Sequence, residues 1–314
     1  RKRFGQNFLH DPGIIQRIVA AIDPQPDDHI AEIGPGQGAI TQHLVDACGA
    51  MDVIELDRDL VPMLEQQFAG SQLKIHNADA LKFDFCSLVT GSEKLRLVGN
   101  LPYNISTPLL FHLLEQAHCI RDLHVMLQKE VVDRIVAVPG SKTYGRLSVA
   151  VQTRCHAQSL FTIGPGAFNP PPKVDSAILR ITPDEDAIGR IRDPALLNRI
   201  LSQAFSQRRK TLRNALKGLA DAPILESLGI DASARAETVT VAGTVNGDIY
   251  GTQKIELSPT ARVEGDLNSP RILIREGATF EGKVNMTGKK SVPNPQPKSD
   301  NGPESAKADD AEDD

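Results

Sequence analysis

The fold of this 314-residue chain is decided by Glu32-Ile33-Gly34-Pro35-Gly36-Gln37-Gly38. This stretch follows an apolar run typical of a buried strand and precedes Thr41–Cys48, whose amphipathic pattern is typical of a helix. Glycines in such a turn let the backbone approach a nucleotide-like ligand, because no Cβ stands in the way. The stretch therefore predicts the first strand-loop-helix unit of an α/β, Rossmann-like sheet.

Two acidic residues downstream indicate what this loop binds. Glu55 lies about twenty residues on, at the predicted end of the next strand, where a carboxylate accepts hydrogen bonds from ribose hydroxyls. Gly34, Gly36 and Ala39 also satisfy a relaxed dinucleotide pattern, so nicotinamide or flavin binding and a ligand-free turn are alternatives. Asp79 ends the third predicted strand and could accept from an adenine amine or cap a helix. Together they favour S-adenosylmethionine.

Apolar runs alternate with helical stretches from Ile14 to about Arg180, which predicts a mostly parallel doubly wound sheet with helices on both faces. The predicted strands are His29–Ile33, Met51–Leu56, Leu73–His76, Leu95–Gly99 and Leu123–Leu127. A second amphipathic helix is expected at Leu60–Phe68. Two later runs, Leu147–His156 and Val174–Ile181, are expected to add a closing hairpin at one edge of the sheet.

The segment Asn100-Leu101-Pro102-Tyr103 follows the fourth predicted strand, at the sheet edge where open α/β folds bind ligands. An adenine exocyclic amine is a poor nucleophile, and the Asn100 side-chain oxygen and the Leu101 carbonyl could accept its N–H bonds. Pro102 would stiffen the turn and Tyr103 would stack on a flipped base. Phe168 could close the other face of that base. An ordinary β-turn with a packed tyrosine, and a buried Phe168, are the alternatives.

Beyond Pro183 the pattern predicts helices only, at Pro194–Phe205, Arg208–Lys217 and Pro223–Leu228. The middle helix is basic, and it would place Arg209, Arg213 and Lys217 on one face. A face of this kind binds RNA phosphates, although a solvated helix surface is the alternative. The candidate RNA-binding residues are Arg208, Arg209, Lys210, Arg213 and Lys217.

A third pattern begins near Gly243. Short strand-like runs recur at Val245-Asn-Gly247-Asp-Ile249, Val263-Glu-Gly265-Asp-Leu267 and Phe280-Glu-Gly282-Lys-Val284, spaced 18 and then 17 residues apart. Such a period predicts coils of a parallel β-helix. The sequence therefore predicts four parts: a catalytic domain (1–182), a helical RNA-binding domain (183–242), β-helix coils (243–288) and a disordered acidic tail (289–314).

Composition excludes a membrane protein, because no apolar run approaches the roughly 18 to 20 residues of a spanning helix, and a cytoplasmic location is expected. The net charge of −5 says little about RNA binding, because the tail alone holds seven acidic residues against four basic ones. The four cysteines form no C-x-x-C pair, which favours reduced thiols over a disulfide or a zinc site. No metal is expected.

These motifs, in this order, resemble the small-subunit ribosomal RNA adenine dimethyltransferase A family over residues 1 to about 240. The matching segments are Arg3–Leu9, Glu32–Gly38, Val53–Asp59, Gly99–Pro108, Met126–Val131, Tyr144–Leu147, Phe168–Ser176 and Gln207–Asn214. The resemblance implies dimethylation of two adjacent adenosines near the 3′ end of 16S rRNA in the 30S particle, with S-adenosylmethionine as cofactor. It also implies that Asn7, Leu9, Gly34, Glu55, Asp79 and Asn100 bind the cofactor and that Asn100 to Tyr103 form the catalytic loop.

The chain departs from that family after Arg235-Ala236-Glu237, where relatives continue into a final helix. Residues Thr244–Met286 resemble part of a bactofilin, a polymer-forming bacterial β-helix protein, which implies self-association through residues 243–288. The main alternative is therefore a cytoskeletal or scaffold subunit that carries an inert methyltransferase fold. An RNA-binding assembly factor without catalysis is another, and a dinucleotide oxidoreductase comes last.

Overall fold

The structure is a computed structural model that describes residues 7–207, 209–239, 244–246, 249–250, 255–257, 262–264, 266–274 and 279–286. The chain divides into two compact units, residues 1–241 and residues 242–314. Among the described residues, none of the helices is long and apolar enough to cross a membrane.

A seven-stranded sheet in the order β4-β3-β2-β5-β6-β9-β7 forms the centre of the first unit. Its strands are β2 (Ile30–Ile33), β3 (Ala50–Glu55), β4 (Gln72–Asn77), β5 (Leu95–Asn100), β6 (Ile120–Gln128), β7 (Cys155–Ile163) and β9 (Ser176–Pro183). The first five run parallel, and β9 and β7 close the sheet in antiparallel pairing. The predicted doubly wound sheet is confirmed.

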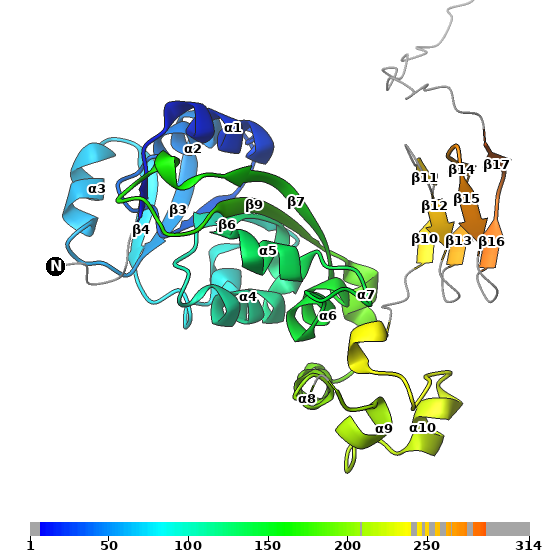
Figure 1. The fold of residues 1–314 in the computed structure, drawn as a ribbon. Helices are drawn as coiled ribbons and strands as arrows, with labels where there is room; N and C mark the ends of the chain where they lie inside the picture. Colours follow the sequence, from blue (N-terminus) through cyan, green and yellow to red (C-terminus); the bar gives the residue numbers. More distant parts are fainter. Residues whose placement is uncertain are drawn as a thin grey trace, which may run out of the picture. The chain divides into compact units, whose positions relative to one another are not determined.

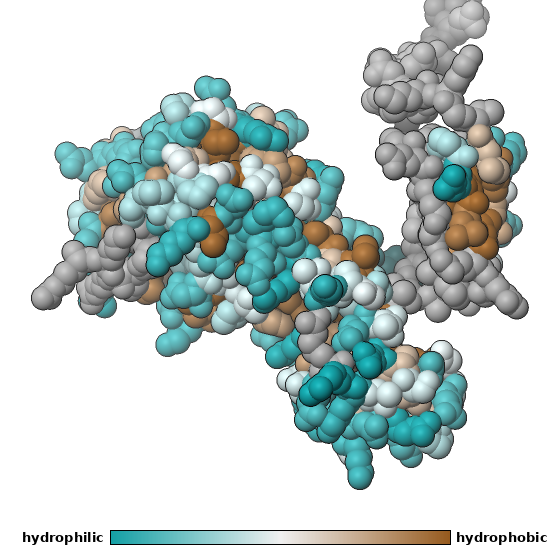
Figure 2. Space-filling model, viewed as in Figure 1, coloured by the Kyte–Doolittle hydropathy of each residue, from teal (hydrophilic) through white to brown (hydrophobic). Residues whose placement is uncertain are grey.

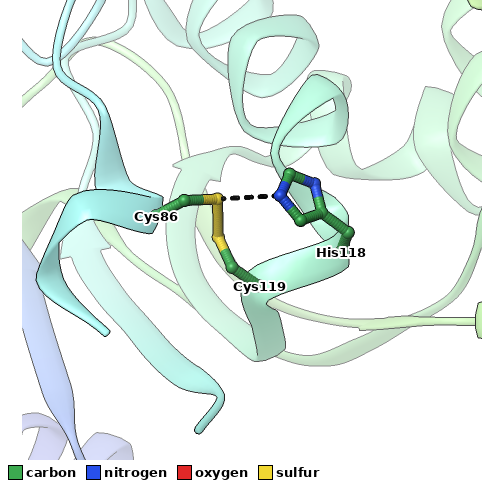
Figure 3. A group of neighbouring side chains, drawn as sticks. All are labelled: Cys86, His118 and Cys119. Atoms are coloured by element: carbon green, nitrogen blue, oxygen red, sulfur yellow. Dashed lines mark hydrogen bonds between the residues drawn. A yellow bond between two sulfur atoms is a disulfide. The ribbon is translucent and has the colours of Figure 1, made fainter. Parts of the chain in front are cut away.

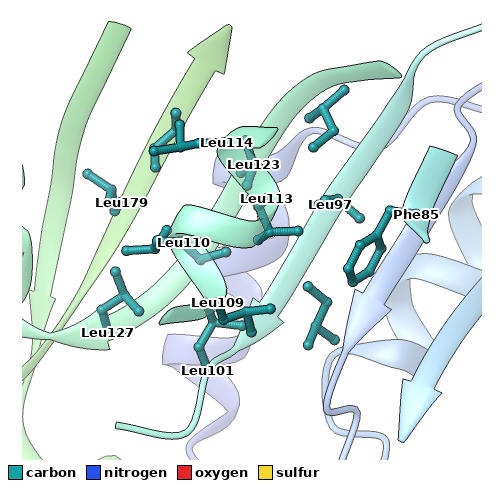
Figure 4. Close-up of a cluster of buried hydrophobic side chains, with 14 of the residues drawn as sticks. Phe85, Leu97, Leu101, Leu109, Leu110, Leu113, Leu114, Leu123, Leu127 and Leu179 are labelled. Atoms are coloured by element: carbon teal, nitrogen blue, oxygen red, sulfur yellow. The ribbon is translucent and has the colours of Figure 1, made fainter. Parts of the chain in front are cut away.

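Helices cover both faces of this sheet (Figure 1). On one face lie α1 (Pro12–Ile22) and α2 (Thr41–Cys48), and on the other lie α4 (Ser106–Glu115), α5 (Lys129–Ile135) and α6 (Arg146–Gln152). A short α3 (Val61–Gln67) precedes β4. Figure 4 shows how leucines of α4 fill the space against β5, β6 and Phe85. This packing fixes where β5 ends and α4 begins, which is where the Asn100–Tyr103 loop lies.

The helix α1 shows how local sequence sets these elements. Asp11 caps its N-terminus by accepting a hydrogen bond from the Ile14 amide, and Pro12 is its first residue. Ile15, Ile18 and Ile22 recur at helical spacing and are buried against the sheet.

The expected closing hairpin is partly wrong. Leu147–His156 does not form a strand: α6 occupies Arg146–Gln152, and the edge strand β7 begins only at Cys155. The helix forms because Ser148 is buried and its hydroxyl both accepts from the Gly145 amide and donates to the Arg134 carbonyl of α5. Alternating apolar residues predicted a strand, and tertiary contacts with α5 outweigh that preference. The other half, Val174–Ile181, is confirmed as β9.

In the described part of the chain, the α-helices that follow the sheet are α7 (Glu185–Arg190), α8 (Pro194–Ala204), α9 (Leu212–Ala215) and α10 (Ala222–Ser227). The last three share a small apolar cluster of their own. The predicted helix Arg208–Lys217 is wrong, because α9 has only four residues and Arg208 lies outside the described part of the chain. The amides of Leu212 and Arg213 donate instead to the carbonyls of Ala234 and Ala232, at 2.8 and 2.9 Å.

Shorter elements complete the first unit. They are the strands β1 (Phe8–Leu9) and β8 (Phe168–Asn169), which pair with each other, and the 3-10 turns η1 (Phe85–Leu88), η2 (Ala117–Cys119), η3 (Pro165–Ala167) and η4 (Ala236–Thr238).

The second unit contains short strands that stack in parallel, as the repeats predict. They are β10 (Thr244–Asn246), β11 (Ile249–Tyr250), β12 (Ile255–Leu257), β13 (Arg262–Glu264), β14 (Leu267–Asn268), β15 (Ile272–Ile274), β16 (Thr279–Glu281) and β17 (Val284–Asn285). Thr244 lies opposite Arg262, and Arg262 lies opposite Thr279, so the register repeats the sequence period. Ile255, Leu257, Val263 and Leu267 are buried between the coils. The predicted tail, 289–314, lies outside the described residues.

Candidate active site

A cavity of about 190 Å³ lies at the carboxyl ends of β2, β3 and β5. It brings together all the residues predicted to bind the cofactor and the whole predicted catalytic loop: Asn7, Leu9, Gly34, Gly36, Glu55, Asp79, Asn100, Leu101, Pro102 and Tyr103. Residues from positions 7 to 103 therefore form one site, at the edge of the sheet where the sequence places it.

The glycine loop adopts a backbone that favours glycine. Gly34 and Gly36 have φ angles of 67° and 59°, in the left-handed region. A Cβ on Gly36 would also lie 3.1 Å from the ring of Phe8, which lines the same cavity. Glycine at position 36 thus lets β1 close over the loop.

The two predicted acidic residues line the cavity, and backbone amides hold both of them. Glu55 accepts from the Asp57 amide at 2.8 Å and from the Gly36 amide at 3.4 Å, and burial raises the pKa of its carboxyl group. Asp79 accepts from the Leu81 amide at 3.0 Å, so it stabilises its own turn while it lines the cavity. Both carboxyl groups are oriented before any ligand binds.

A third acidic residue, Glu32, is the first residue of the glycine motif, and the sequence alone assigns it no role in the site. It lines the cavity, is almost fully buried and accepts a hydrogen bond of 2.6 Å from the Thr41 hydroxyl. Burial, only partly offset by that bond, raises the pKa of Glu32 to about 7. An acidic residue inside an otherwise apolar strand was the signal that could have identified it.

The loop after β5 is held from several sides. The Asn100 side-chain amide donates to the Asn7 carbonyl at 3.3 Å, and the Leu101 amide donates to the Met126 carbonyl at 3.1 Å while its side chain is buried in the core. Just upstream, a Cβ on Gly99 would lie 2.5 Å from the Ile33 carbonyl oxygen. Glycine there lets β5 lie close to β2 and brings Asn100 beside the glycine loop.

Tyr103 is anchored by Ser176, to which the sequence alone assigns no role of its own. Its hydroxyl lies 2.7 Å from the hydroxyl of Ser176, a buried residue at the start of β9. The Ser106 hydroxyl donates to the Tyr103 carbonyl at 3.1 Å. The tyrosine is therefore held at both its backbone and its side chain, and it lines the cavity.

Phe168 is not brought to the cavity. Its side chain is 2% exposed and packs in the apolar cluster that contains Leu9, Ile15 and Ile178. It does not line the pocket that Tyr103 lines. Its backbone pairs with Leu9 of β1, and its side chain shares the buried cluster with Leu9.

The candidate RNA-binding residues lie apart from this cavity, around α9. Arg209, Lys210, Arg213 and Lys217 are exposed to solvent, and Arg208 lies outside the described residues. Only Arg213 lies within α9, so the expected common helical face of Arg209, Arg213 and Lys217 is absent. These cations extend over an irregular segment instead.

The cysteines differ from the expectation. Cys48 and Cys155 are free and buried, as predicted, but Cys86 and Cys119 form a disulfide across 33 residues of sequence. The absence of a C-x-x-C pair said nothing about these two, because η1 and η2 bring them together through the fold.

The cavity fits S-adenosylmethionine by the chemistry of the groups that line it. Glu55 can accept from ribose hydroxyls, Asp79 can accept from an adenine amine, and the glycine loop leaves room for backbone approach. The sequence shows no residue set for hydride transfer to a nicotinamide.

Comparison with known proteins agrees with this site. The family model described as ribosomal RNA adenine dimethylase matches residues 1–250, and a model described as polymer-forming cytoskeletal (bactofilin) matches residues 220–285. The chain is 56% identical over 246 residues to ribosomal RNA small subunit methyltransferase A of Pseudomonas fluorescens, covering 78% of this chain and 91% of that protein. The Pseudomonas putida protein of the same name is also 56% identical, with 78% and 92% covered.

Two solved structures share the fold of the first unit. A dimethyladenosine transferase from Plasmodium falciparum aligns with a TM-score of 0.60 and 30% identity, covering 70% of this chain and 78% of that one. The 23S rRNA methyltransferase ErmE aligns with a TM-score of 0.57 and 25% identity, covering 74% and 95%. With the glycine loop, the acidic residues and the Asn100–Tyr103 loop in one cavity, the chain belongs to the ribosomal RNA adenine dimethylase family of S-adenosylmethionine-dependent methyltransferases.

Proposed function

We propose that this chain dimethylates the exocyclic amines of two adjacent adenosines near the 3′ end of 16S rRNA, in the 30S particle and in the cytoplasm. The observation that carries the proposal is the position of Asn100. It lies between the glycine loop and Tyr103 in a single cavity, so a cofactor methyl group and a target amine can meet beside it.

Asn100 has the chemistry to activate the amine. Its side-chain NH₂ donates to the Asn7 carbonyl, which turns its Oδ1 into the acceptor available to a ligand. Accepting an N–H bond of the target amine draws electron density onto that nitrogen, and the Leu101 carbonyl supplies a second acceptor. Bound S-adenosylmethionine supplies an activated methyl group. No strong base is needed, because the methylated ammonium is acidic enough to lose its proton to water.

Tyr103 and Pro102 shape the place of the base. A flipped adenine stacked on the Tyr103 ring would gain roughly 1–3 kcal/mol, as in other base-stacking sites. The ring is held in place by the hydrogen bond between its hydroxyl and Ser176. The exposed cations from Arg209 to Lys217 would bind rRNA phosphates and give an affinity that falls with salt.

The proposal is tested by single-turnover transfer of a labelled methyl group to unmethylated 30S particles. Asn100→Ala should reduce the rate by about a hundredfold or more, because one transition-state acceptor is lost. Cofactor affinity, measured separately by calorimetry, should change far less. Gln66→Ala is the control for loss of an amide side chain, because Gln66 is exposed on α3 and does not line the cavity, and it should transfer methyl groups normally.

Near-normal transfer by Asn100→Ala would exclude the loop as the catalytic centre. If the wild-type protein bound S-adenosylmethionine and 30S particles but transferred no methyl group, this result would favour an assembly factor without catalysis.

A second function rests on the parallel coils of the second unit. Figure 2 shows hydrophobic surface on its described part, and its exposed apolar residues are Leu273, Ile274, Val284 and Met286. Among the described strands, β10 and β16 lie at the two ends of one three-stranded ladder, so each presents an edge that pairs with none of the other described strands. Stacking with another copy would cover these edges. Sedimentation of the full chain and of a chain ending at residue 241 tests whether the coils self-associate. Self-association of the full chain alone supports this function, and monomeric behaviour of both proteins refutes it.

A further inference from the structure

A cluster of three metal-ligating side chains lies outside the proposed active site. Cys86 belongs to η1, and His118 and Cys119 belong to η2, which follows α4. The catalytic loop precedes α4, so the cluster lies at the opposite end of this ten-residue helix, about 15 Å away along its axis. The proposed methyl transfer uses none of these residues.

The three side chains converge. Figure 3 shows the His118 ring directed at the Cys86 sulfur, and its Nε2 lies 3.4 Å from that sulfur. All three ligand atoms lie within 4.8 Å of one another. Cys119 is buried, Cys86 is half-buried and His118 is exposed, so the cluster opens to solvent on the histidine side.

Contacts other than the disulfide hold this arrangement together. The Gln116 side-chain oxygen accepts from the Phe85 amide at 2.7 Å and from the Cys86 amide at 3.3 Å. Its side-chain NH₂ donates to the Phe83 carbonyl at 3.2 Å. Gln116 thus ties the segment carrying Cys86 to the end of α4, beside Cys119. The two sulfur atoms should therefore remain neighbours when the disulfide is reduced.

We propose that the reduced form of this cluster binds a soft divalent cation such as Zn²⁺ through Cys86 Sγ, Cys119 Sγ and His118 Nε2, and that the disulfide closes the site. Thiolate and imidazole ligands are those that Zn²⁺ prefers. Tetrahedral Zn²⁺ with bonds of about 2.3 Å to sulfur and 2.0 Å to nitrogen places these atoms about 3.5 Å apart. The observed 3.4 Å between Cys86 and His118 already matches that separation. Solvent supplies the fourth ligand.

Closure of the site is a balanced thiol–disulfide exchange. The two zinc-bound thiolates lose two electrons, and the sulfur–sulfur bond of Cys86 and Cys119 forms. A small-molecule disulfide such as oxidised glutathione takes up those electrons, its own sulfur–sulfur bond breaks, and its two thiolates take two protons from water to give free thiols. The bound cation is released because both anionic ligands are consumed.

The test is calorimetric titration of the full chain with Zn²⁺, after reduction with a phosphine that is then removed. The reduced protein should bind one Zn²⁺ per chain, and protein oxidised with glutathione disulfide should bind none. Cys86→Ser and His118→Ala should each weaken binding by more than the roughly 10- to 100-fold that loss of an outer-shell partner costs. Cys48→Ser is the matched control, since Cys48 is buried elsewhere and bonds to the Leu44 carbonyl, and it should bind normally.

The exposed His118 keeps the test decisive if a cysteine variant fails to fold, because its removal disturbs no core packing. As a second measurement, Co²⁺ bound to reduced protein should show a thiolate-to-metal absorption band that Cys119→Ser weakens. Absence of Zn²⁺ binding by the reduced wild-type chain, or undiminished binding by His118→Ala, would overturn the proposal.

Discussion

Glu32→Gln should make the stability of the protein less dependent on pH. Glu32 is buried beside the glycine loop, and its pKa is raised from 4.5 to about 7, chiefly by burial. A raised pKa means that the folded state binds the proton more tightly than the unfolded state does. The resulting stabilisation is complete below the unfolded pKa and is lost as the pH rises through the folded pKa. The wild-type protein should therefore lose stability from weakly acidic to weakly alkaline pH.

The magnitude follows from these two pKa values. Each pH unit between them changes the free energy of unfolding by up to about 1.4 kcal/mol, so the loss between about pH 5 and about pH 8 is about 2 to 3 kcal/mol. Glutamine cannot ionise, and its side-chain oxygen can still accept the hydrogen bond from Thr41. The variant should lack this part of the pH dependence. Its free energy of unfolding should therefore rise relative to that of the wild type as the pH rises.

The measurement is denaturant unfolding of both proteins at several pH values, with the free energy of unfolding taken from each curve. Glu65→Gln is the matched control, because Glu65 is exposed on α3, and its pH dependence should equal that of the wild type. If Glu32→Gln and wild type lost stability in parallel over this range, the buried carboxyl group would not be the cause and the reasoning would be refuted.

Three further predictions concern the loop and the two units. Gly99→Ala should destabilise the fold by about 1 to 3 kcal/mol or more, since its Cβ meets a backbone oxygen, whereas Gly189→Ala in α7, with nothing within 4 Å, should be neutral or stabilising in thermal unfolding. Ser176→Ala should raise KM for 30S particles and leave cofactor affinity unchanged, because it releases the Tyr103 hydroxyl; an unchanged KM would argue against this. A chain ending at residue 241 should keep its fold and its methyl transfer, and loss of both by circular dichroism and transfer assay would contradict the division into two units.

Local sequence patterns predicted the elements whose apolar residues or glycines recur at regular spacing. The five parallel strands, α2 and the stacked coils follow from apolar periodicity and glycine spacing, and the parallel topology then places Glu55, Asp79 and Asn100 at one edge. The failures all involve partners distant in sequence. Ser148 makes α6 a helix through a carbonyl 14 residues away, and the Tyr103–Ser176 contact spans 73 residues.

The same reason explains the other features that the sequence did not predict. The irregular backbone around Arg213 depends on the carbonyls of Ala232 and Ala234, and Cys86 and Cys119 pair across a separation of 33 residues. Phe168 could not be assigned to core or cavity from its sequence neighbours, because its strand partner Leu9 lies about 160 residues earlier in the chain. Burial by a distant segment leaves no periodic signal in the chain.

The last described residues of the first unit, Glu237 to Val239, are held by hydrogen bonds from within that unit. The Tyr144 hydroxyl donates to the Val239 carbonyl at 3.0 Å, and the Gly140 amide donates to the Glu237 carbonyl at 2.7 Å, so these bonds secure the last described residues of the unit to the loop before α6. Both bonds are made by residues up to Val239, ahead of β10, the first described strand of the second unit. An exchange of the module that begins at β10 would therefore leave both bonds, and the attachment that they provide, in place.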